Sequence, residues 1–373
     1  MKVIIAAAGT AGHINPGIAI ANKIMEEDRN SKVIFIGTTR GIENDLVPRS
    51  GYELKTIEAY GLSKKISIEN IKKNIKTLQG FSQAKKIIEE FKPDIVIGTG
   101  GYICGAVISS AHKLKIPTLL HESNAFPGKA TKFLSKKTNI ILVSFKETKA
   151  RLKSKNNVIH TGTPVKIQKQ EYSLDKKIEI LKSLGLKAAL PIVLVFGGSQ
   201  GAKNINDALI DIITKKLNDK YQIVWAAGPK QYDKVVERLK DKGIAIQILE
   251  NIKILPYIYN MEEVMNISDL IVSRSGAMTI TEIANLAKPS ILIPLPNVSH
   301  NHQMYNAKVL ENVYAARIIE DKNLYGELLD STIKKIVLDT DKIKKMGKNA
   351  TKIEMKNVLD SIYHEIKLLT RKK

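Results

Sequence analysis

The feature that most constrains the fold is the regular alternation of short Val- and Ile-rich runs with longer segments that carry Lys and Glu. Continuous apolar runs are typical of strands buried on both faces, and the segments between them have helical spacing. The alternation predicts βαβ units around parallel sheets. The expected strands are Val3–Ala8, Val33–Gly37, Ile95–Gly98, Thr118–His121, Ile140–Val143 and Val158–Ile159, and then Ile192–Phe196, Ile223–Ala226, Ile244–Leu249, Leu270–Val272, Ile291–Ile293 and Ala315–Ile319.

The strand cycle starts again after a polar stretch, so a chain of 373 residues is expected to form two doubly wound α/β domains. We place the linker at 163–175, with one domain at 1–163 and the other at 164–354. Residues from about 355 to 373 carry one apolar helical stripe, which we expect to pack back on the first domain. Two such domains in tandem would face each other across a cleft, and their ligands would bind beyond the carboxyl ends of the strands.

The composition narrows the class of function. Lys and Arg number 59 against 37 Asp and Glu, a formal charge of +22, which favours phosphate, anionic lipid or nucleic acid as partners without choosing among them. The single cysteine, Cys104, excludes an internal disulfide framework and a Cys-rich metal site, and it fits a reducing cytoplasm. No run of about 18 apolar residues occurs, so membrane contact would be peripheral.

Glycine-rich turns follow the strands at 9–17, 98–102 and 197–201. Glycine lets backbone amides approach a phosphate or a sugar at the start of a helix, although such turns also serve only to connect a strand to a helix. Gly9, Gly12 and Gly17 do not fit the dinucleotide spacing, which weakens a nicotinamide dehydrogenase as an alternative. His13 is either a general base or a helix-capping residue, and its position alone leaves both open.

The strongest local signal is the segment 273–282, again a strand, a glycine turn and the start of a helix. Successive amides at such a turn can neutralise a diphosphate. Glu282 would lie beside them and could accept two hydrogen bonds from a ribose diol, unless it is an ordinary acid on the helix surface. The loop 294–303 carries amide and imidazole groups suited to sugar hydroxyls.

Together these motifs resemble the MurG glycosyltransferases over nearly the whole chain. The segments that carry the resemblance are Gly9-Thr10-Ala11-Gly12-His13, His121-Glu122-Ser123-Asn124, Gly197-Gly198-Ser199-Gln200-Gly201-Ala202, Arg274-Ser275-Gly276-Ala277 with Thr279 and Glu282, and His302-Gln303 with Asn306-Ala307. The resemblance implies a GT-B fold and an inverting enzyme that moves N-acetylglucosamine from UDP-GlcNAc to the C4 hydroxyl of lipid I. We expect no cofactor and no metal, because the helix start at 275–279 and nearby cations can stabilise the departing UDP. We interpret the one Asp-x-Asp, at 339–341, as a turn or helix cap.

The resemblance also implies roles for single residues. From its place at the first glycine turn, His13 is also our candidate for the base, with Glu122 as its rival. Donor contacts would come from Thr10, Ala11, Gly12, Asn124, Lys166, Ser199, Ile258, Arg274, Ser275, Gly276, Ala277, Met278, Thr279, Glu282 and Gln303. Among these, Ser199 and 277–279 would bind the diphosphate, Glu282 the ribose and Ile258 would lie beside uracil. Lys166 stands where the family has arginine, and the first turn has alanine at positions 8 and 11 where the family is usually glycine-richer.

Lysines alternate with apolar residues between 61 and 88, and this pattern predicts either a membrane-binding helix or an ordinary amphipathic helix. The membrane-binding candidates are Ile68, Ile71, Lys72, Ile75, Lys76, Leu78 and Phe81. A lipid-linked acceptor favours the first reading and a place on the cytoplasmic face of the cell membrane. The expected partners are therefore UDP-GlcNAc, undecaprenyl-linked lipid I, an anionic membrane surface and proteins of cell-wall synthesis.

Two alternatives stay open at this point. A UDP-GlcNAc 2-epimerase would share the donor machinery, but it would need carboxylates near the sugar and no lipid-binding strip. A basic nucleic-acid-binding protein would use the positive charge, but aromatic residues make up only 5% of the chain and no nucleic-acid-binding motif is recognised.

Overall fold

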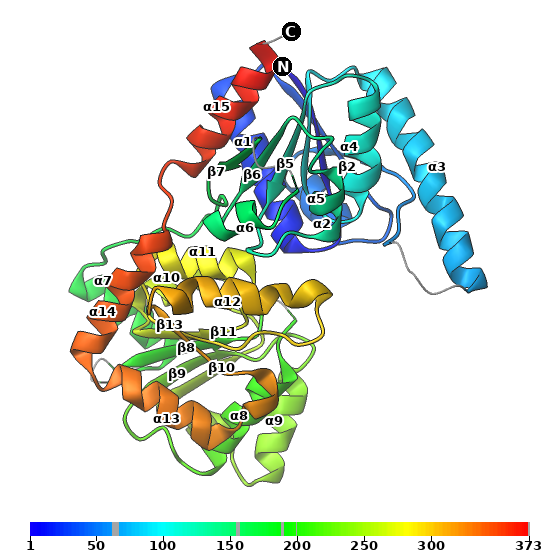
Figure 1. The fold of residues 1–373 in the computed structure, drawn as a ribbon. Helices are drawn as coiled ribbons and strands as arrows, with labels where there is room; N and C mark the ends of the chain where they lie inside the picture. The colour runs from blue at the N-terminus through cyan, green and yellow to red at the C-terminus, as the bar shows by residue number, and fades with distance from the viewer. Residues whose placement is uncertain (62–66, 154–156, 188–189, 199, 372–373) are drawn as a thin grey trace. The chain divides into compact units, whose positions relative to one another are not determined.

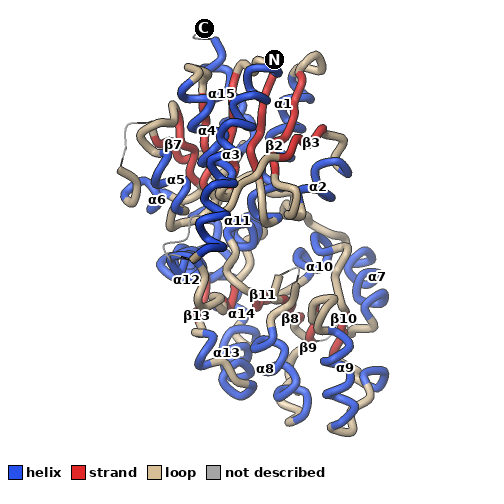
Figure 2. The backbone as a smooth tube through the Cα atoms, turned by 90° about the vertical axis from the view of Figure 1, so that its right-hand side faces the viewer, coloured by secondary structure: helices blue, strands red, loops and turns tan. Residues whose placement is uncertain are grey.

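The computed structural model describes residues 1–61, 67–153, 157–187, 190–198 and 200–371. The chain divides into two compact units, which we call the N-terminal unit (Met1–Val165 with Met355–Lys373) and the C-terminal unit (Lys166–Glu354). Each is a parallel sheet with helices on both faces (Figures 1 and 2). The predicted α/β class with two Rossmann-like sheets is confirmed. The boundary between the units lies two residues after the one predicted from the sequence.

The N-terminal unit has a seven-stranded sheet of order β3-β2-β1-β4-β5-β6-β7. Its strands are β1 (Lys2–Ala7), β2 (Lys32–Gly37), β3 (Glu53–Thr56), β4 (Ile95–Gly100), β5 (Thr118–Glu122), β6 (Ile140–Val143) and β7 (Val158–His160). Its helices are α1 (Ala11–Glu27), α2 (Glu43–Arg49), α3 (Ile68–Phe91), α4 (Ile103–Lys113), α5 (Lys129–Leu134), α6 (Lys146–Ala150) and α15 (Val358–Arg371).

Alternating side chains of β1 build two separate cores in this unit. Val3 and Ile5 face α1 and α15, whereas Ile4 and Ala6 face α3 and α4. The last helix, α15, packs against α1 and contributes Ile362 to the first of these cores (Figure 1). The chain therefore returns to the N-terminal unit after completing the C-terminal one.

The C-terminal unit has a six-stranded sheet of order β10-β9-β8-β11-β12-β13. Its strands are β8 (Ile192–Phe196), β9 (Gln222–Ala226), β10 (Ile252–Leu255), β11 (Leu270–Ser273), β12 (Ser290–Leu292) and β13 (Ala316–Ile318). Its helices are α7 (Leu174–Leu184), α8 (Lys203–Thr214), α9 (Tyr232–Asp241), α10 (Met261–Ile267), α11 (Ala277–Asn285), α12 (His302–Asn312), α13 (Gly326–Val337) and α14 (Thr340–Ala350), with 3-10 turns η1 (Ile246–Ile248), η2 (Ser299–Asn301), η3 (Asp321–Asn323) and η4 (Thr351–Ile353).

The structure corrects the strand predictions at two places. The strand expected at Ile244–Leu249 is wrong, because that segment contains η1 and leaves Ile248 72% exposed, and the strand follows it as β10. Edge strand β3 was missed because its sequence Glu-Leu-Lys-Thr is mostly polar and solvent-facing. The cap interpretation of 339–341 is confirmed, since the Asp339 carboxylate accepts a hydrogen bond from the Lys342 amide at the start of α14. Among the described helices, none is long and apolar enough to cross a membrane.

Candidate active site

Strand order places the glycine turns of each unit side by side. In the N-terminal unit β1 pairs with β4, so the turn at 9–17 lies next to the turn at 98–102. In the C-terminal unit β8 pairs with β11, which brings together the turns at 197–201 and 274–279. Both pairs lie where the strand order reverses direction, which is the usual ligand site of a doubly wound sheet.

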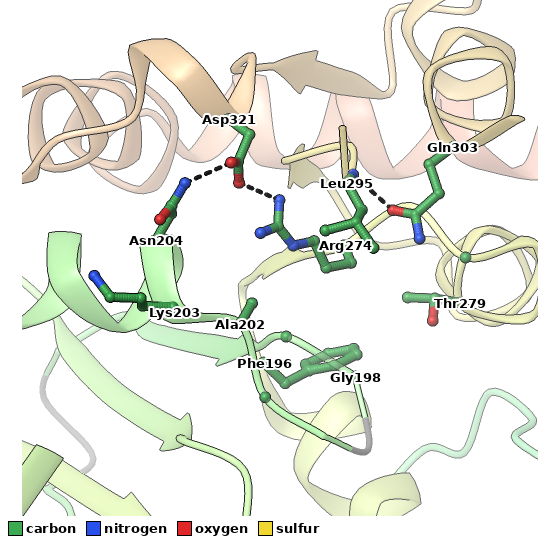
Figure 3. A pocket seen from close by; sticks show the side chains of 13 residues that line it. Phe196, Gly198, Ala202, Lys203, Asn204, Arg274, Thr279, Leu295, Gln303 and Asp321 are labelled. Atoms are coloured by element: carbon green, nitrogen blue, oxygen red, sulfur yellow. Dashed lines mark hydrogen bonds and ion pairs between the residues drawn. The ribbon is translucent and has the colours of Figure 1, made fainter. Parts of the chain in front are cut away.

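The C-terminal unit has a cavity of about 420 Å³ at this point (Figure 3). It is lined by Phe196, Gly197, Gly198, Gly201, Ala202, Lys203, Asn204, Arg274, Gly276, Thr279, Leu295, Gln303 and Asp321. Four of the predicted donor residues are therefore brought together: Arg274, Gly276, Thr279 and Gln303. Ser199 lies outside the described residues.

Helix α11 begins at this cavity with its amides available. Gly276 is the N-cap residue and, within the described part of the chain, no side chain caps this end of the helix. The first intrahelical bond runs from the Ile280 amide to the Gly276 carbonyl at 3.0 Å, so the amides of Ala277, Met278 and Thr279 precede the hydrogen-bonded ladder. Such an end carries a partial positive charge and suits a diphosphate.

Arg274 and Ser275 have structural partners. The Arg274 guanidinium pairs with Asp321, which also accepts a hydrogen bond from Asn204, and both charged side chains are 9% exposed (Figure 3). The Ser275 hydroxyl donates to the Gln303 carbonyl at 2.8 Å, which fastens α12 to the turn. These two residues therefore shape the cavity, and the arginine charge is neutralised by Asp321.

Glu282 is a half-buried carboxylate in α11. Burial raises its pKa to about 7, and among the described residues none donates a hydrogen bond to it. Gln303 uses its Oε1 to accept from the Leu295 amide at 2.9 Å, which fixes the orientation of its amide group (Figure 3). Ile258 is buried and Lys166 is exposed, and neither lines the cavity.

In the N-terminal unit, His13 lies in the first turn of α1 and is half-buried. Its Nδ1 lies 3.0 Å from the Ala8 carbonyl. Because a carbonyl only accepts, Nδ1 carries the proton and the neutral ring presents an unprotonated Nε2. The ring covers Gly100, where an added Cβ would lie 2.2 Å from the histidine Cδ2. The N-cap residue is Thr10, so His13 does not cap the helix.

The first turn is held by a buried carboxylate, Glu43. Its Oε2 accepts from the Gly9 amide at 3.0 Å, and its Oε1 accepts from the Thr38 amide at 3.0 Å and hydroxyl at 2.7 Å. Burial alone would raise the pKa of Glu43, but these hydrogen bonds hold it below the ordinary value. Thr10, Ala11 and Gly12 follow directly, with Thr10 exposed and the other two half-buried.

Glu122 is the anchor of the loop that follows β5. Its two oxygens accept from the amide and side chain of Asn124, from the Gly128 amide at 2.9 Å and from the Thr131 hydroxyl at 2.6 Å. Four donors on one buried carboxylate favour a structural role and argue against Glu122 as the proton acceptor. Asn124 is thereby fixed in place.

Helix α3 presents only part of the predicted membrane strip. Ile75 and Leu78 are 51% and 69% exposed, and Lys72 and Lys76 are exposed too. Phe81 instead packs against the core under α4, which corrects its assignment to the strip. The side chains of Ile68 and Ile71 lie outside the described part of the chain.

The chain matches known proteins along almost its full length. Residues 3–143 match the glycosyltransferase family 28 N-terminal domain, and residues 192–362 match the glycosyltransferase family 28 C-terminal domain. A protein of Acetivibrio thermocellus named UDP-N-acetylglucosamine--N-acetylmuramyl-(pentapeptide) pyrophosphoryl-undecaprenol N-acetylglucosamine transferase is 42% identical, over 100% of this chain and 99% of that protein. A protein of the same name from Clostridioides difficile is 38% identical, over 98% and 88% of the two chains. The chain belongs to the MurG transferase family.

Solved structures agree with this membership. The crystal structure of Acinetobacter baumannii MurG has a TM-score of 0.77 and 25% identity, covering 98% of this chain and 99% of that one. A putative UDP-N-acetylglucosamine 2-epimerase from Listeria monocytogenes has a TM-score of 0.69 at 13% identity over 98% and 95% of the chains, which shows a shared fold only.

Sequence reasoning missed two carboxylates of this MurG family member, Glu43 and Asp321. Neither belongs to a glycine turn, because each reaches its turn from a different strand–helix connection. A signal for Glu43 exists in the sequence: Gly37 and Gly41 precede it, and an added Cβ at either glycine would lie within 2.8 Å of its side chain. Asp321 has no comparable signal.

Proposed function

We propose that this chain is an inverting glycosyltransferase of peptidoglycan synthesis. It transfers N-acetylglucosamine from UDP-GlcNAc to the C4 hydroxyl of the N-acetylmuramyl unit in lipid I, giving lipid II. The observation that carries the proposal is the 42% identity to a transferase of this name along the entire chain. The cavity and the glycine turns at the reversal point of each sheet support it.

The donor side of the proposal rests on the C-terminal unit. The amides of 277–279 would bind the diphosphate, and their partial positive charge would stabilise the departing UDP. Glu282, a half-buried acid with its pKa raised to about 7, would accept hydrogen bonds from the ribose diol. Gln303 would bind the sugar hydroxyls, since its side-chain orientation is already fixed by the Leu295 amide.

The chemical step is a direct displacement at the anomeric carbon. The C4 oxygen of the acceptor forms the new bond as the bond to UDP breaks, and the acceptor proton passes to a base. His13 fits this role because its Nδ1 is held by the Ala8 carbonyl, which leaves Nε2 to accept the proton. We propose no metal and no cofactor for this step.

Incubation of the purified protein with radiolabelled UDP-GlcNAc and a short-chain lipid I analogue tests the function. We expect a labelled disaccharide-lipid product. Conversion of UDP-GlcNAc to its 2-epimer without that product would instead identify an epimerase. A salt-sensitive shift of labelled DNA together with no sugar chemistry would favour nucleic-acid binding.

We also propose that α3 attaches the protein peripherally to an anionic membrane surface, the cytoplasmic leaflet in the cell. Exposed Ile75 and Leu78 beside Lys72 support this, because apolar burial and lysine charge both add to binding. Changing both apolar residues to Ser should weaken sedimentation with phosphatidylglycerol vesicles but leave turnover of the short-chain acceptor unchanged. A control with Leu174→Ser and Ile248→Ser removes two apolar side chains of the C-terminal unit that are each 72% exposed. Equal losses of vesicle binding in both variants would contradict the proposal.

A further inference from the structure

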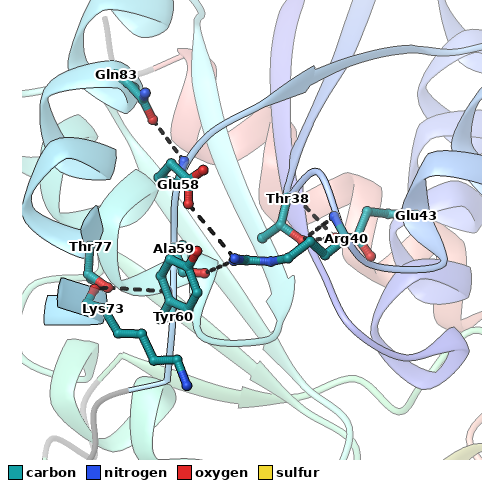
Figure 4. A network of polar contacts seen from close by, with 9 residues as sticks. All are labelled: Thr38, Arg40, Glu43, Glu58, Ala59, Tyr60, Lys73, Thr77 and Gln83. Carbon is teal, nitrogen blue, oxygen red and sulfur yellow. Dashed lines mark hydrogen bonds and ion pairs between the residues drawn. The ribbon is translucent and has the colours of Figure 1, made fainter. Parts of the chain in front are cut away.

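Arg40 forms a cationic platform with Tyr60 beside the sheet of the N-terminal unit (Figure 4). Its guanidinium carbon lies 3.8 Å from the centre of the Tyr60 ring, and its Nη2 donates to the Ala59 carbonyl at 2.9 Å. The Arg40 side chain is nevertheless 41% exposed. An arginine stacked on an aromatic ring keeps its plane fixed and offers its remaining N–H groups outward.

The positive charge of Arg40 is only loosely compensated by the protein. The nearest carboxylate oxygen, Glu58 Oε2, lies 3.9 Å from Nη1, which is too long for a hydrogen bond. A second cation adds to the charge, because Lys76 Nζ lies 6.0 Å from the centre of the same Tyr60 ring. A guanidinium has five donors, so its contacts with the protein leave others for an anion.

One side of this platform is tied to the first glycine turn. Arg40 lies in the connection between β2 and α2, three residues before Glu43. Glu43 accepts from Thr38, which joins the two ends of the connection (Figure 4). The same carboxylate accepts from the Gly9 amide at 3.0 Å, so the connection is fixed to the turn that carries His13.

The other side of the platform is tied to α3. The Tyr60 amide donates to the Thr77 hydroxyl at 3.2 Å, and the Glu58 amide donates to Gln83 Oε1 at 2.8 Å (Figure 4). Gly80 permits this close approach, because a Cβ there would lie 1.8 Å from the Glu58 carbonyl oxygen. Arg40 therefore stands between the turn of His13 and the helix with the exposed apolar side chains.

We infer that Arg40 binds the pyrophosphate of the lipid-linked acceptor. The inference rests on the proposed function, in which the acceptor is a lipid, a pyrophosphate and a sugar in linear order. With the lipid end toward α3 and the sugar hydroxyl at His13, the pyrophosphate falls at the platform. A planar, fixed guanidinium forms bidentate hydrogen bonds with phosphate oxygens.

Two non-reacting, short-chain acceptor analogues test this inference as competitive inhibitors. One keeps the pyrophosphate, and the other has a neutral linker in its place. Arg40→Ala should raise the inhibition constant of the pyrophosphate analogue about ten- to a hundredfold, the effect of losing charged hydrogen bonds. The constant of the neutral analogue and the KM for UDP-GlcNAc should stay within about twofold. Arg40→Lys keeps the positive charge but loses the planar guanidinium. Its inhibition constant for the pyrophosphate analogue should fall between those of the wild type and Arg40→Ala.

Two controls separate binding from folding. Arg49→Ala removes another exposed arginine of the N-terminal unit, which among the described residues pairs only with Asp45 on its own helix, and it should change neither constant. Arg40→Ala should keep the melting temperature close to that of the wild type. Equal weakening of both analogues, or no weakening of either, overturns the inference while the wild-type activity still supports the proposed function. A wild-type protein that transfers no sugar to the lipid I analogue overturns the proposed function itself.

Discussion

The N-terminal and C-terminal units both place glycine turns where the strand order reverses, but the side chains that contact those turns differ. In the N-terminal unit the Glu43 carboxylate accepts a hydrogen bond from the Gly9 amide. The neighbouring turn at 98–102 packs under the ring of His13. In the C-terminal unit the carboxylate of Asp321 instead neutralises Arg274, and the amides at the start of α11 are left for a ligand.

This difference matters for what each turn can do. The Gly9 amide is already bonded to the Glu43 carboxylate and cannot also bind an anion. Under the proposed function, the turn at 9–17 would serve to position the imidazole of His13. A helix end with open amides beside a neutralised arginine would attract a diphosphate through its backbone dipoles. Under the proposed function, the same strand–turn–helix pattern would support proton transfer in the N-terminal unit and anion binding in the C-terminal unit.

The largest expected effect comes from His13. His13→Ala should lower kcat by about 10²–10⁴-fold, the usual contribution of a positioned base, with little change in UDP affinity. His13→Asn should be as slow, since an amide does not accept the proton. Steady-state kinetics with the short-chain acceptor and UDP binding by calorimetry measure the two effects. A kcat loss below tenfold in both variants, or an unaltered acidic limb of the pH–rate profile, would show that His13 is not the base. The N-terminal turn would then have no assigned part in proton transfer.

The next largest effect concerns binding of the donor by Glu282 in the C-terminal unit. Glu282→Ala should raise the KM for UDP-GlcNAc roughly ten- to a hundredfold, because bonds from two hydroxyls to a charged group contribute about 2–3 kcal/mol. Glu327→Ala removes an exposed acid from the same unit and is the matched control. An unchanged donor KM in a folded Glu282→Ala protein would make this acid a part of the helix surface.

The pH dependence of donor binding tests the same residue independently. Since burial raises the pKa of Glu282 to about 7, the acceptor form of the carboxylate is scarce at pH 6 and predominates at pH 8. UDP-GlcNAc affinity should therefore rise about tenfold over that interval. Glu282→Gln should flatten the profile, as titration calorimetry at several pH values can measure. A profile that Glu282→Gln leaves unchanged assigns the pH dependence to another group.

The sequence predicted those features that depend on residues close together in the chain, namely the strands and the glycine turns. Buried Val and Ile runs located most of the strands, and the glycine turns after them lie where the strand order of each sheet reverses direction. The sequence did not predict contacts between residues far apart in the chain. Asp321 is 47 residues from Arg274, and no local pattern indicates that they form an ion pair. Edge strand β3 and the inward-facing Phe81 were missed for a related reason, since their exposure depends on which neighbour covers them.

A smaller effect concerns how the first turn is held. Glu43→Gln should lower the free energy of unfolding at pH 7 by about 1.5–3 kcal/mol, the range for hydrogen bonds to a charged group. The pKa of Glu43 is lowered by folding, so its charge stabilises the protein above the ordinary value of 4.5, and this stabilisation is lost as pH falls through the folded pKa. The gap between variant and wild type should thus narrow in acid, as urea denaturation at pH 7 and pH 4 can measure. Glu53→Gln, an exposed acid on β3, is the control, and a gap independent of pH would contradict the charge-based account.

The smallest expected change is the response to metal removal, and it tests whether the open amides of the C-terminal unit suffice for the diphosphate. Residues 339–341 cap α14 through Asp339, so this Asp-x-Asp has a structural use already. If the helix end at 277–279 stabilises the departing UDP, turnover should stay within about twofold after treatment with EDTA. Added magnesium or manganese should then give no gain beyond that range. Activity that disappears with EDTA and returns with either ion would contradict this expectation. It would mean that the backbone dipoles at 277–279 do not suffice, and that a metal ion in the C-terminal unit is needed to stabilise the departing UDP.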